Sequence, residues 1–102
     1  MAIVEYIRYV LTTLSADQLI GAYRDAARHL DAAPECLGYD LVRCVDDPAQ
    51  LILRIRWRSA NAHLQGFRAG PNFPPFLDAI RPFIPEIVEM RHYQPTAVAS
   101  DG

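Results

Sequence analysis

Residues 50–58, QLILRIRWR, alternate between apolar and charged side chains more cleanly than any other stretch of the chain. Alternate side chains of a β-strand point to opposite faces of a sheet, so this stretch is predicted to be a strand. One face carries Leu51, Leu53, Ile55 and Trp57, and the other carries Ile52, Arg54, Arg56 and Arg58. We therefore expect helices to cover the apolar face and to leave the arginine face open.

The segments on either side of this strand predict three more strands and a set of helices. Residues 2–11, 36–45 and 86–94 are rich in apolar, β-branched and aromatic side chains, as strands are. Ser15 is a suitable N-cap for a helix that ends at Pro34. Ser59 precedes a predicted helix over residues 60–69, and a shorter helical segment over 73–81 is broken by Pro82 and Pro85.

The order of these elements, β-α-β-β-α-β, is typical of the ferredoxin-like fold. This α+β architecture has a four-stranded antiparallel sheet with its helices on one face. We expect one domain over residues 1–95 and a flexible C-terminal tail over 96–102.

The open face of the sheet is predicted to be a dimer interface. We assign the more charged alternate set of each strand to this face, which joins Glu5, Asp40, Glu89 and Arg91 to Arg54 and Arg56. The same face would carry Ile3, Ile7, Tyr9, Ile52, Ile87 and Tyr93, which is too much apolar surface for comfortable solvation. A two-fold homodimer with arginine–carboxylate pairs would bury it. The alternative is a solvated, salt-bridged face.

The composition excludes several classes of protein. The chain has 102 residues, 51% hydrophobic and 22% charged, as expected for one globular domain. A net charge of −2 gives no basic surface for nucleic acid. No apolar run approaches the roughly 18 residues that a membrane helix needs, and Glu5 and Arg8 interrupt the N-terminal apolar stretch that a signal peptide would require. A soluble cytoplasmic protein is expected.

Cysteines and short motifs give no sign of a cofactor. Cys36 and Cys44 lie on one predicted strand, roughly 26 Å apart at about 3.3 Å per residue, whereas a disulfide needs Cα atoms within about 7 Å. Reduced thiols are therefore expected. The sequence has no CxxC, HExxH or GxSxG motif and no glycine-rich phosphate loop. Neither a metal nor a nucleotide is expected.

One segment resembles a known family. Residues 57–76, WRSANAHLQGFRAGPNFPPF, are similar to a stretch with a tryptophan, a histidine and two phenylalanines in the antibiotic biosynthesis monooxygenase family, within the dimeric α+β barrel superfamily. The strands VEYIRY and EMRHYQP resemble the ends of that domain, so the resemblance covers about residues 2–95. Where the family commonly has a histidine in the second helix, this chain has Phe67, and His63 lies one turn earlier.

This resemblance implies a homodimer whose two sheets form a barrel, with a pocket between sheet and helices in each subunit. Enzymes of the family oxidise aromatic polyketides or quinols with O₂, without metal or flavin. It therefore suggests a cofactor-independent monooxygenase with a small aromatic or quinol-type substrate and O₂ as co-substrate. The alternatives are a haem-binding or haem-degrading protein, with His63 or His92 as axial ligand, and a non-enzymatic dimer that binds a small ligand.

Three residues are the candidates for catalysis. His92 could remove a phenolic proton to give an electron-rich anion that reacts with O₂. Trp57 could stack on a flat substrate, and Tyr6 could orient a substrate hydroxyl. The candidate substrate-binding residues are Tyr39, His63, Phe67, Phe73, Phe76 and Met90. The structural alternative for each is a core side chain with an ordinary partner.

Overall fold

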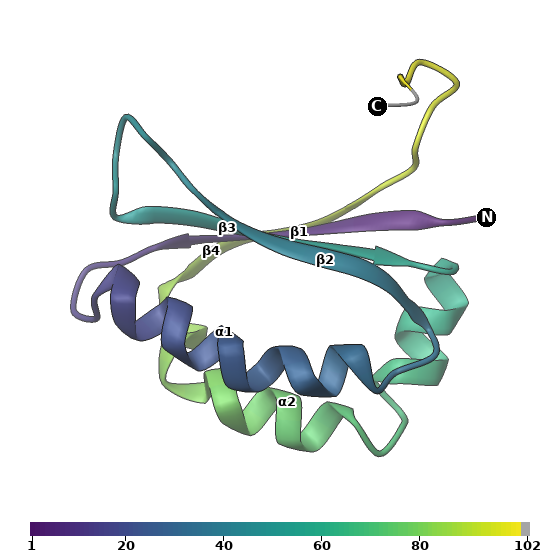
Figure 1. The fold of residues 1–102 in the computed structure, drawn as a ribbon, viewed down its shortest axis with the longest axis horizontal. Helices are drawn as coiled ribbons and strands as arrows, with labels where there is room; N and C mark the ends of the chain where they lie inside the picture. The colour runs from purple at the N-terminus through teal and green to yellow at the C-terminus, as the bar shows by residue number, and fades with distance from the viewer. Residues whose placement is uncertain (101–102) are drawn as a thin grey trace.

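In the computed structural model, which describes residues 1–100, a sheet is covered by helices on one face only (Figure 1). The strands are β1 (Ile3–Val10), β2 (Cys36–Arg43), β3 (Gln50–Trp57) and β4 (Ile87–Tyr93). They form a four-stranded antiparallel sheet in the order β2-β3-β1-β4. The helical elements are α1 (Ala16–Asp31), the π-helix η1 (Ala62–Phe67), α2 (Phe73–Ile80) and the 3-10 helix η2 (Arg81–Glu86). The predicted ferredoxin-like α+β fold is confirmed.

Helix α1 begins where the sequence predicts. The Gln18 backbone N–H donates to Ser15 Oγ at 3.1 Å, and the Ser15 N–H donates to Gln18 Oε1 at 2.8 Å, so the two residues form a capping box. Apolar side chains along one face of the helix pack onto the sheet, namely Ala16, Leu19, Tyr23, Ala26 and Leu30. Within residues 1–100, no helix is long and apolar enough to cross a membrane.

The predicted helix over residues 60–69 is wrong in type, because its central turns are π-helical. The Arg68 N–H donates to the His63 carbonyl, five residues back, at 3.0 Å. The wide turn brings Gly66 against Glu35, where a Cβ would lie 2.8 Å from Glu35 Cγ. Both His63 and Phe67 are 2% exposed. Short π-helical turns are rare and often lie at functional sites.

The predicted faces of β2, β3 and β4 are confirmed at the positions that matter for the site. Leu51, Leu53, Ile55 and Trp57 are at most 1% exposed and face the helices. Arg54 lies on the opposite face and pairs with Asp40, with 2.8 Å between Nε and Oδ1. On β4, Arg91 Nε lies 3.1 Å from Glu89 Oε2 on the same open face.

The predicted orientation of β1 is wrong. The register pairs Glu5 with Ile55 and Tyr9 with Leu51, and directly opposite residues of antiparallel strands share a face. Glu5 is 2% exposed and Tyr9 0%. Charge could not orient this strand, because each alternate set carries one charged residue, Glu5 or Arg8. The set with the bulkier aliphatic side chains, Ile3 and Ile7 with Tyr9, faces the core.

Two corrections follow from the true orientation of β1. Glu5 is a core residue and not an interface residue, whereas Tyr6 and Arg8 lie on the open face. Ile3, Ile7 and Tyr9 belong to the covered face, and Ile87 also packs against the core. The register between β1 and β4 shifts between Arg8 and Tyr9, which is why the alternation along β4 did not place Ile87 correctly.

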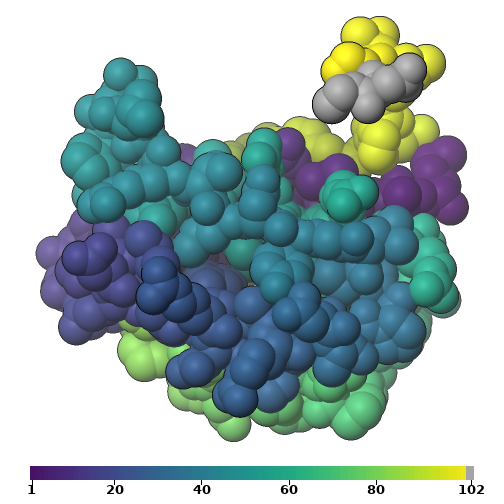
Figure 2. Space-filling model, in the orientation of Figure 1, coloured from purple at the N-terminus to yellow at the C-terminus, as the bar shows by residue number. Residues whose placement is uncertain are grey.

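The open face combines ion pairs with aromatic side chains. Tyr6 and Tyr93 meet edge to face, with 5.1 Å between ring centroids. Arg8 Nε lies 3.7 Å from Glu89 Oε1. Figure 2 shows the turn between β2 and β3 and the segment after β4 standing out from the body at opposite ends of the sheet. Residues 96–100 of the predicted tail form neither helix nor strand, and residues 101–102 lie outside the described residues.

Glu86 joins the loop between β1 and α1 to the start of β4. Its Oε1 accepts the backbone N–H groups of Thr12 and Thr13 at 3.1 and 2.9 Å. The hydroxyl groups of Thr12 and Thr13 donate to the same carboxylate at 2.7 and 3.0 Å. These hydrogen bonds lower the pKa of Glu86 from its ordinary value of 4.5 to about 2.

We expect Glu86→Gln to destabilise the protein at neutral pH, because the amide loses the charge-assisted hydrogen bonds. Since the pKa of Glu86 is lower in the folded state, the stability it contributes is present above pH 4.5 and is lost as the pH falls toward about 2. Urea denaturation across this range should therefore show a difference from the unmodified protein that shrinks on acidification. Asp46→Asn, in the exposed turn after β2, is the control. A difference that did not depend on pH would contradict this account.

Candidate functional site

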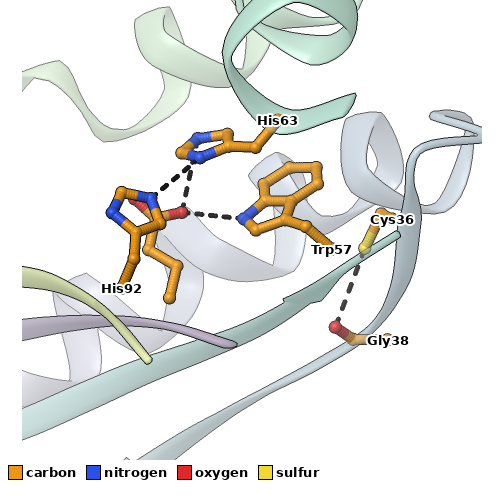
Figure 3. Close-up of polar contacts among 6 residues, drawn as sticks. Cys36, Gly38, Trp57, His63 and His92 are labelled. Atoms are coloured by element: carbon orange, nitrogen blue, oxygen red, sulfur yellow. Dashed lines mark hydrogen bonds and ion pairs between the residues drawn. The ribbon is translucent and has the colours of Figure 1, made fainter. Parts of the chain in front are cut away.

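Side chains from four separate elements meet on the covered side of the sheet. Glu5 comes from β1, Trp57 from β3, His63 from η1 and His92 from β4. Figure 3 shows Trp57, His63 and His92 facing one another. The Trp57 indole N–H donates to Glu5 Oε1 at 3.0 Å, and His63 Nδ1 lies 3.0 Å from His92 Nε2. His63 Nε2 lies 3.5 Å from Glu5 Oε1, and His92 Nε2 lies 3.8 Å from Glu5 Oε2. We refer to Glu5, His63 and His92 as the triad.

Glu5 is an acid inside an otherwise apolar core. Burying a carboxylate disfavours its charged form, and this desolvation raises the pKa of Glu5 above its ordinary value. The hydrogen bond from Trp57 opposes the rise, as do the nearby His92 and Arg68. The indole N–H therefore stabilises the ionised carboxylate and holds it in one position.

His63 lies between the tryptophan and the other histidine. Its ring stacks on Trp57, with 4.5 Å between centroids and 9° between planes. Burial, followed by Arg68 and His92, lowers the pKa of His63 from 6.5 to about 4. His63 is therefore a neutral imidazole near pH 7, in which one nitrogen carries a proton and the other a lone pair. The His92 side chain is 39% exposed, so the pair connects the core to solvent.

A cavity of about 220 Å³ opens beside Glu5, Trp57 and His63. The structure brings together five of the predicted substrate-binding residues in its lining, namely His63, Phe67, Phe73, Phe76 and Met90. Phe67 meets Phe73 and Phe76 edge to face at 5.7 and 5.5 Å between centroids. The lining is thus mostly apolar, with aromatic and aliphatic side chains beside Glu5, His63 and Arg68. Such a cavity suits a flat apolar molecule that carries a hydroxyl group.

Two candidate residues lie elsewhere. Tyr6 points away from the cavity, because β1 has the opposite orientation to the one predicted, and it lines the open face with Arg54. Tyr39 lies on the covered side, but its hydroxyl donates to Asp31 Oδ1 at 2.8 Å and it borders a different cavity, of about 490 Å³, between α1 and the sheet. Glu5, in turn, was not expected at the site. The bulky residues Ile3, Ile7 and Tyr9 lie on the same face of β1 as Glu5, and their pattern is the signal that could have placed Glu5 on the covered side.

The sequence matches the family model for antibiotic biosynthesis monooxygenase over residues 3–79, which is more than half of the chain. The chain belongs to this family. For this member of the antibiotic biosynthesis monooxygenase family, the match includes Glu5, Trp57 and His63, whereas His92 lies beyond its end. No curated protein sequence matches the chain significantly.

Several solved structures have the same fold. A protein from Bordetella bronchiseptica that is named for the family is 18% identical, with a TM-score of 0.78 over 93% of this chain and 97% of that one. A family-named protein from Chloroflexus aurantiacus is 20% identical, with a TM-score of 0.76 over 100% of both chains. SnoaB from Streptomyces nogalater, described as a cofactor-independent oxygenase, is 17% identical, with a TM-score of 0.72 over 97% of this chain and 95% of its own. At these identities the comparisons show a shared fold.

Proposed function

We propose that this chain is a cofactor-independent monooxygenase that oxidises a small aromatic phenol or quinol with O₂. The observation that carries the proposal is the triad and Trp57 at the side of an aromatic-lined cavity. Family membership supports a monooxygenase, and the fold shared with SnoaB supports one without a cofactor. We place the enzyme in the cytoplasm, whose reducing conditions suit the free Cys36 and Cys44.

The two histidines would act as the base. A phenolic O–H in the cavity gives its proton to His63, and His92 passes it on to solvent. The low pKa of His63 means that the proton does not stay there. Trp57 and Glu5 hold the His63 ring in position. The electron-rich anion then reacts with O₂. A ring C–H para to the phenolic oxygen becomes C=O and the phenolic C–O becomes the second C=O of a quinone. The other oxygen atom of O₂ leaves as water, which takes up the ring hydrogen and the phenolic proton.

The size of the cavity restricts the substrate. Its volume of about 220 Å³ is below the roughly 300–1,000 Å³ of pockets that hold drug-sized ligands. The proposed substrate therefore has one or two rings. The lining offers the rings of Phe73 and Phe76 among aliphatic side chains and few polar groups, so a single hydroxyl would point toward His63.

We expect an aerobic assay of the purified protein to show turnover of hydroquinones or naphthoquinols, and slower turnover of three-ring anthrones. O₂ uptake and product absorbance measure it. The rate should not change after treatment with EDTA, and His92→Ala should lower it by about 10²-fold or more. His29→Ala, a histidine of α1 outside the triad, is the control.

Two outcomes of this assay would overturn the proposed activity. One is no turnover across the panel. The other is an equal rate for His92→Ala. Thermal stabilisation by quinones without turnover would indicate a ligand-binding dimer instead. A Soret shift on haem titration, lost in His92→Ala, would indicate the haem-binding alternative.

The open face is the proposed homodimer interface. It combines paired charges, such as Asp40 with Arg54, and exposed aromatic surface, including Tyr93 at 47%. The turn between β2 and β3 and the segment after β4, which stand out at opposite ends of the sheet, would contact a second copy bound to this face (Figure 2). Partner side chains would then bury Tyr6 and Tyr93, which a monomer leaves in contact with water. Arg54 and Arg56 are the proposed charged partners.

Sedimentation at micromolar concentration should give a dimer of two 11.5 kDa chains. Arg54→Glu should shift it toward the monomer, because the change reverses a charge of the proposed interface and leaves Asp40 without its partner. Arg24→Glu makes the same change in charge on exposed α1 and should leave the dimer intact. A monomer in the unmodified protein, or equal dissociation of the two variants, would exclude this interface.

A further inference from the structure

We propose that Glu5, His63 and His92 form a binding site for one divalent transition-metal ion, of the chemistry of Zn²⁺ or Co²⁺. One ligand atom from each residue lies within 4.8 Å of the other two. The site would be a second mode of the same triad, beyond the proposed metal-free oxidation. The proposal also differs from the expectation drawn from the sequence motifs, which indicated no metal.

The distances between donor atoms fit a common centre. Ligands about 2.0–2.2 Å from an ion at tetrahedral or octahedral angles are about 3.0–3.5 Å from each other. The two facing histidine nitrogens are 3.0 Å apart, and His92 Nε2 is 3.8 Å from Glu5 Oε2. The three donor atoms lie within 4.8 Å of one another, so an ion between them needs the carboxylate and the half-exposed His92 ring to move inward.

The donor types determine the class of metal. Two imidazoles and one carboxylate suit Zn²⁺, Co²⁺ or Fe²⁺, whereas Mg²⁺ and Ca²⁺ prefer sites made entirely of oxygen. Three protein ligands are also the number found in zinc sites that keep an open position for water or substrate. Since Glu5 and His63 line the cavity, a molecule bound there would be close to such an ion.

The surroundings already hold the ligands in place. The Trp57 N–H donates to Glu5 Oε1, which leaves Oε2 directed toward His92. Outer hydrogen bonds of this kind orient metal ligands and strengthen binding. Stacking on Trp57 fixes the plane of the His63 ring. The 39% exposure of the His92 side chain provides a route for the ion from solvent. Arg68 is the nearby positive charge that would oppose the ion.

Metal binding and metal-free oxidation would exclude each other. An ion takes the lone pairs of His63 and His92 that the oxidation needs for its proton. We therefore expect added Zn²⁺ to inhibit the proposed oxidation, and EDTA to restore it. The metal site itself is tested by binding alone, so that its failure and the failure of the proposed activity are distinguishable.

The experiment uses the full chain without a polyhistidine tag, stripped with EDTA and dialysed. Titration with ZnCl₂ by calorimetry should give one ion per chain, and CoCl₂ should give visible ligand-field absorption. His92→Ala and Glu5→Gln should each weaken Zn²⁺ binding at least about tenfold. His29→Ala should bind like the unmodified protein, and far-UV circular dichroism checks that each variant folds.

Two results would overturn the metal site. The first is no Zn²⁺ bound at micromolar concentrations, with a featureless Co²⁺ spectrum. The second is an equal affinity in His92→Ala and the unmodified protein, which would place the ion elsewhere. Because His92 is partly exposed, its replacement is not expected to unfold the chain, and Glu5→Gln gives an independent result if it does.

Discussion

Replacing Trp57 with alanine is expected to lower the free energy of unfolding by about 3–5 kcal/mol. The side chain is 0% exposed, stacks on His63 and packs on Phe67 at 4.9 Å between centroids. Its loss would leave a cavity and also remove the indole donor from buried Glu5. Small domains are stable by only about 5–15 kcal/mol, so this one change should remove a large part of the total.

Urea denaturation followed by far-UV circular dichroism measures the effect. Tryptophan fluorescence cannot be used, because Trp57 is the only tryptophan and the variant lacks it. Trp57→Phe keeps an aromatic ring but removes the N–H, and it should cost about 1–3 kcal/mol for the unsatisfied acceptor. A loss below about 1 kcal/mol for Trp57→Ala would show that this tryptophan is not an anchor of the core.

The comparison of Trp57→Phe with the unmodified protein also tests the charge state of Glu5. Because burial raises the pKa of Glu5 in the folded protein, stability should fall as the pH rises from 4.5 through that raised pKa. The Trp57 hydrogen bond limits the rise. In Trp57→Phe the decline should therefore be steeper and extend to higher pH. Glu5→Gln should remove this pH dependence.

How much of the fold the sequence could predict depends on how many independent signals each strand carries. On β3 the residues 53–57 alternate without exception, and the structure agrees with their predicted orientation. On β1 the charges are divided between the faces, and burial of Glu5 depends on a donor from Trp57, 52 residues away. No pattern local to β1 contains that partner. The π-helical turn of η1 likewise packs against a distant residue, since Gly66 lies close to Glu35.

The site was predictable in its parts but not in its arrangement. The aromatic residues of 57–76 identified part of the cavity lining, and Phe73 and Phe76, three residues apart on α2, lie on one side of that helix. The contact between His63 and His92 joins residues 29 positions apart, so it is set by the fold. Tyr6 was misplaced by the same error that moved Glu5, since a change of strand orientation exchanges the two faces together.

Replacing His63 with phenylalanine should lower kcat of the proposed oxidation by about 10²–10⁴-fold, because it removes the proton acceptor. Phenylalanine keeps a flat ring against Trp57, so the loss should not be explained by unfolding. The pH profile tests the role of His63 directly. If His63 receives the proton first, the rate should stay high on acidification until the pH nears its pKa of about 4, where the imidazole becomes protonated. A rate that instead fell well above pH 4 would remove His63 from that role. Phe67→Leu, which changes the cavity wall, is the control and should keep the pH profile of the unmodified protein.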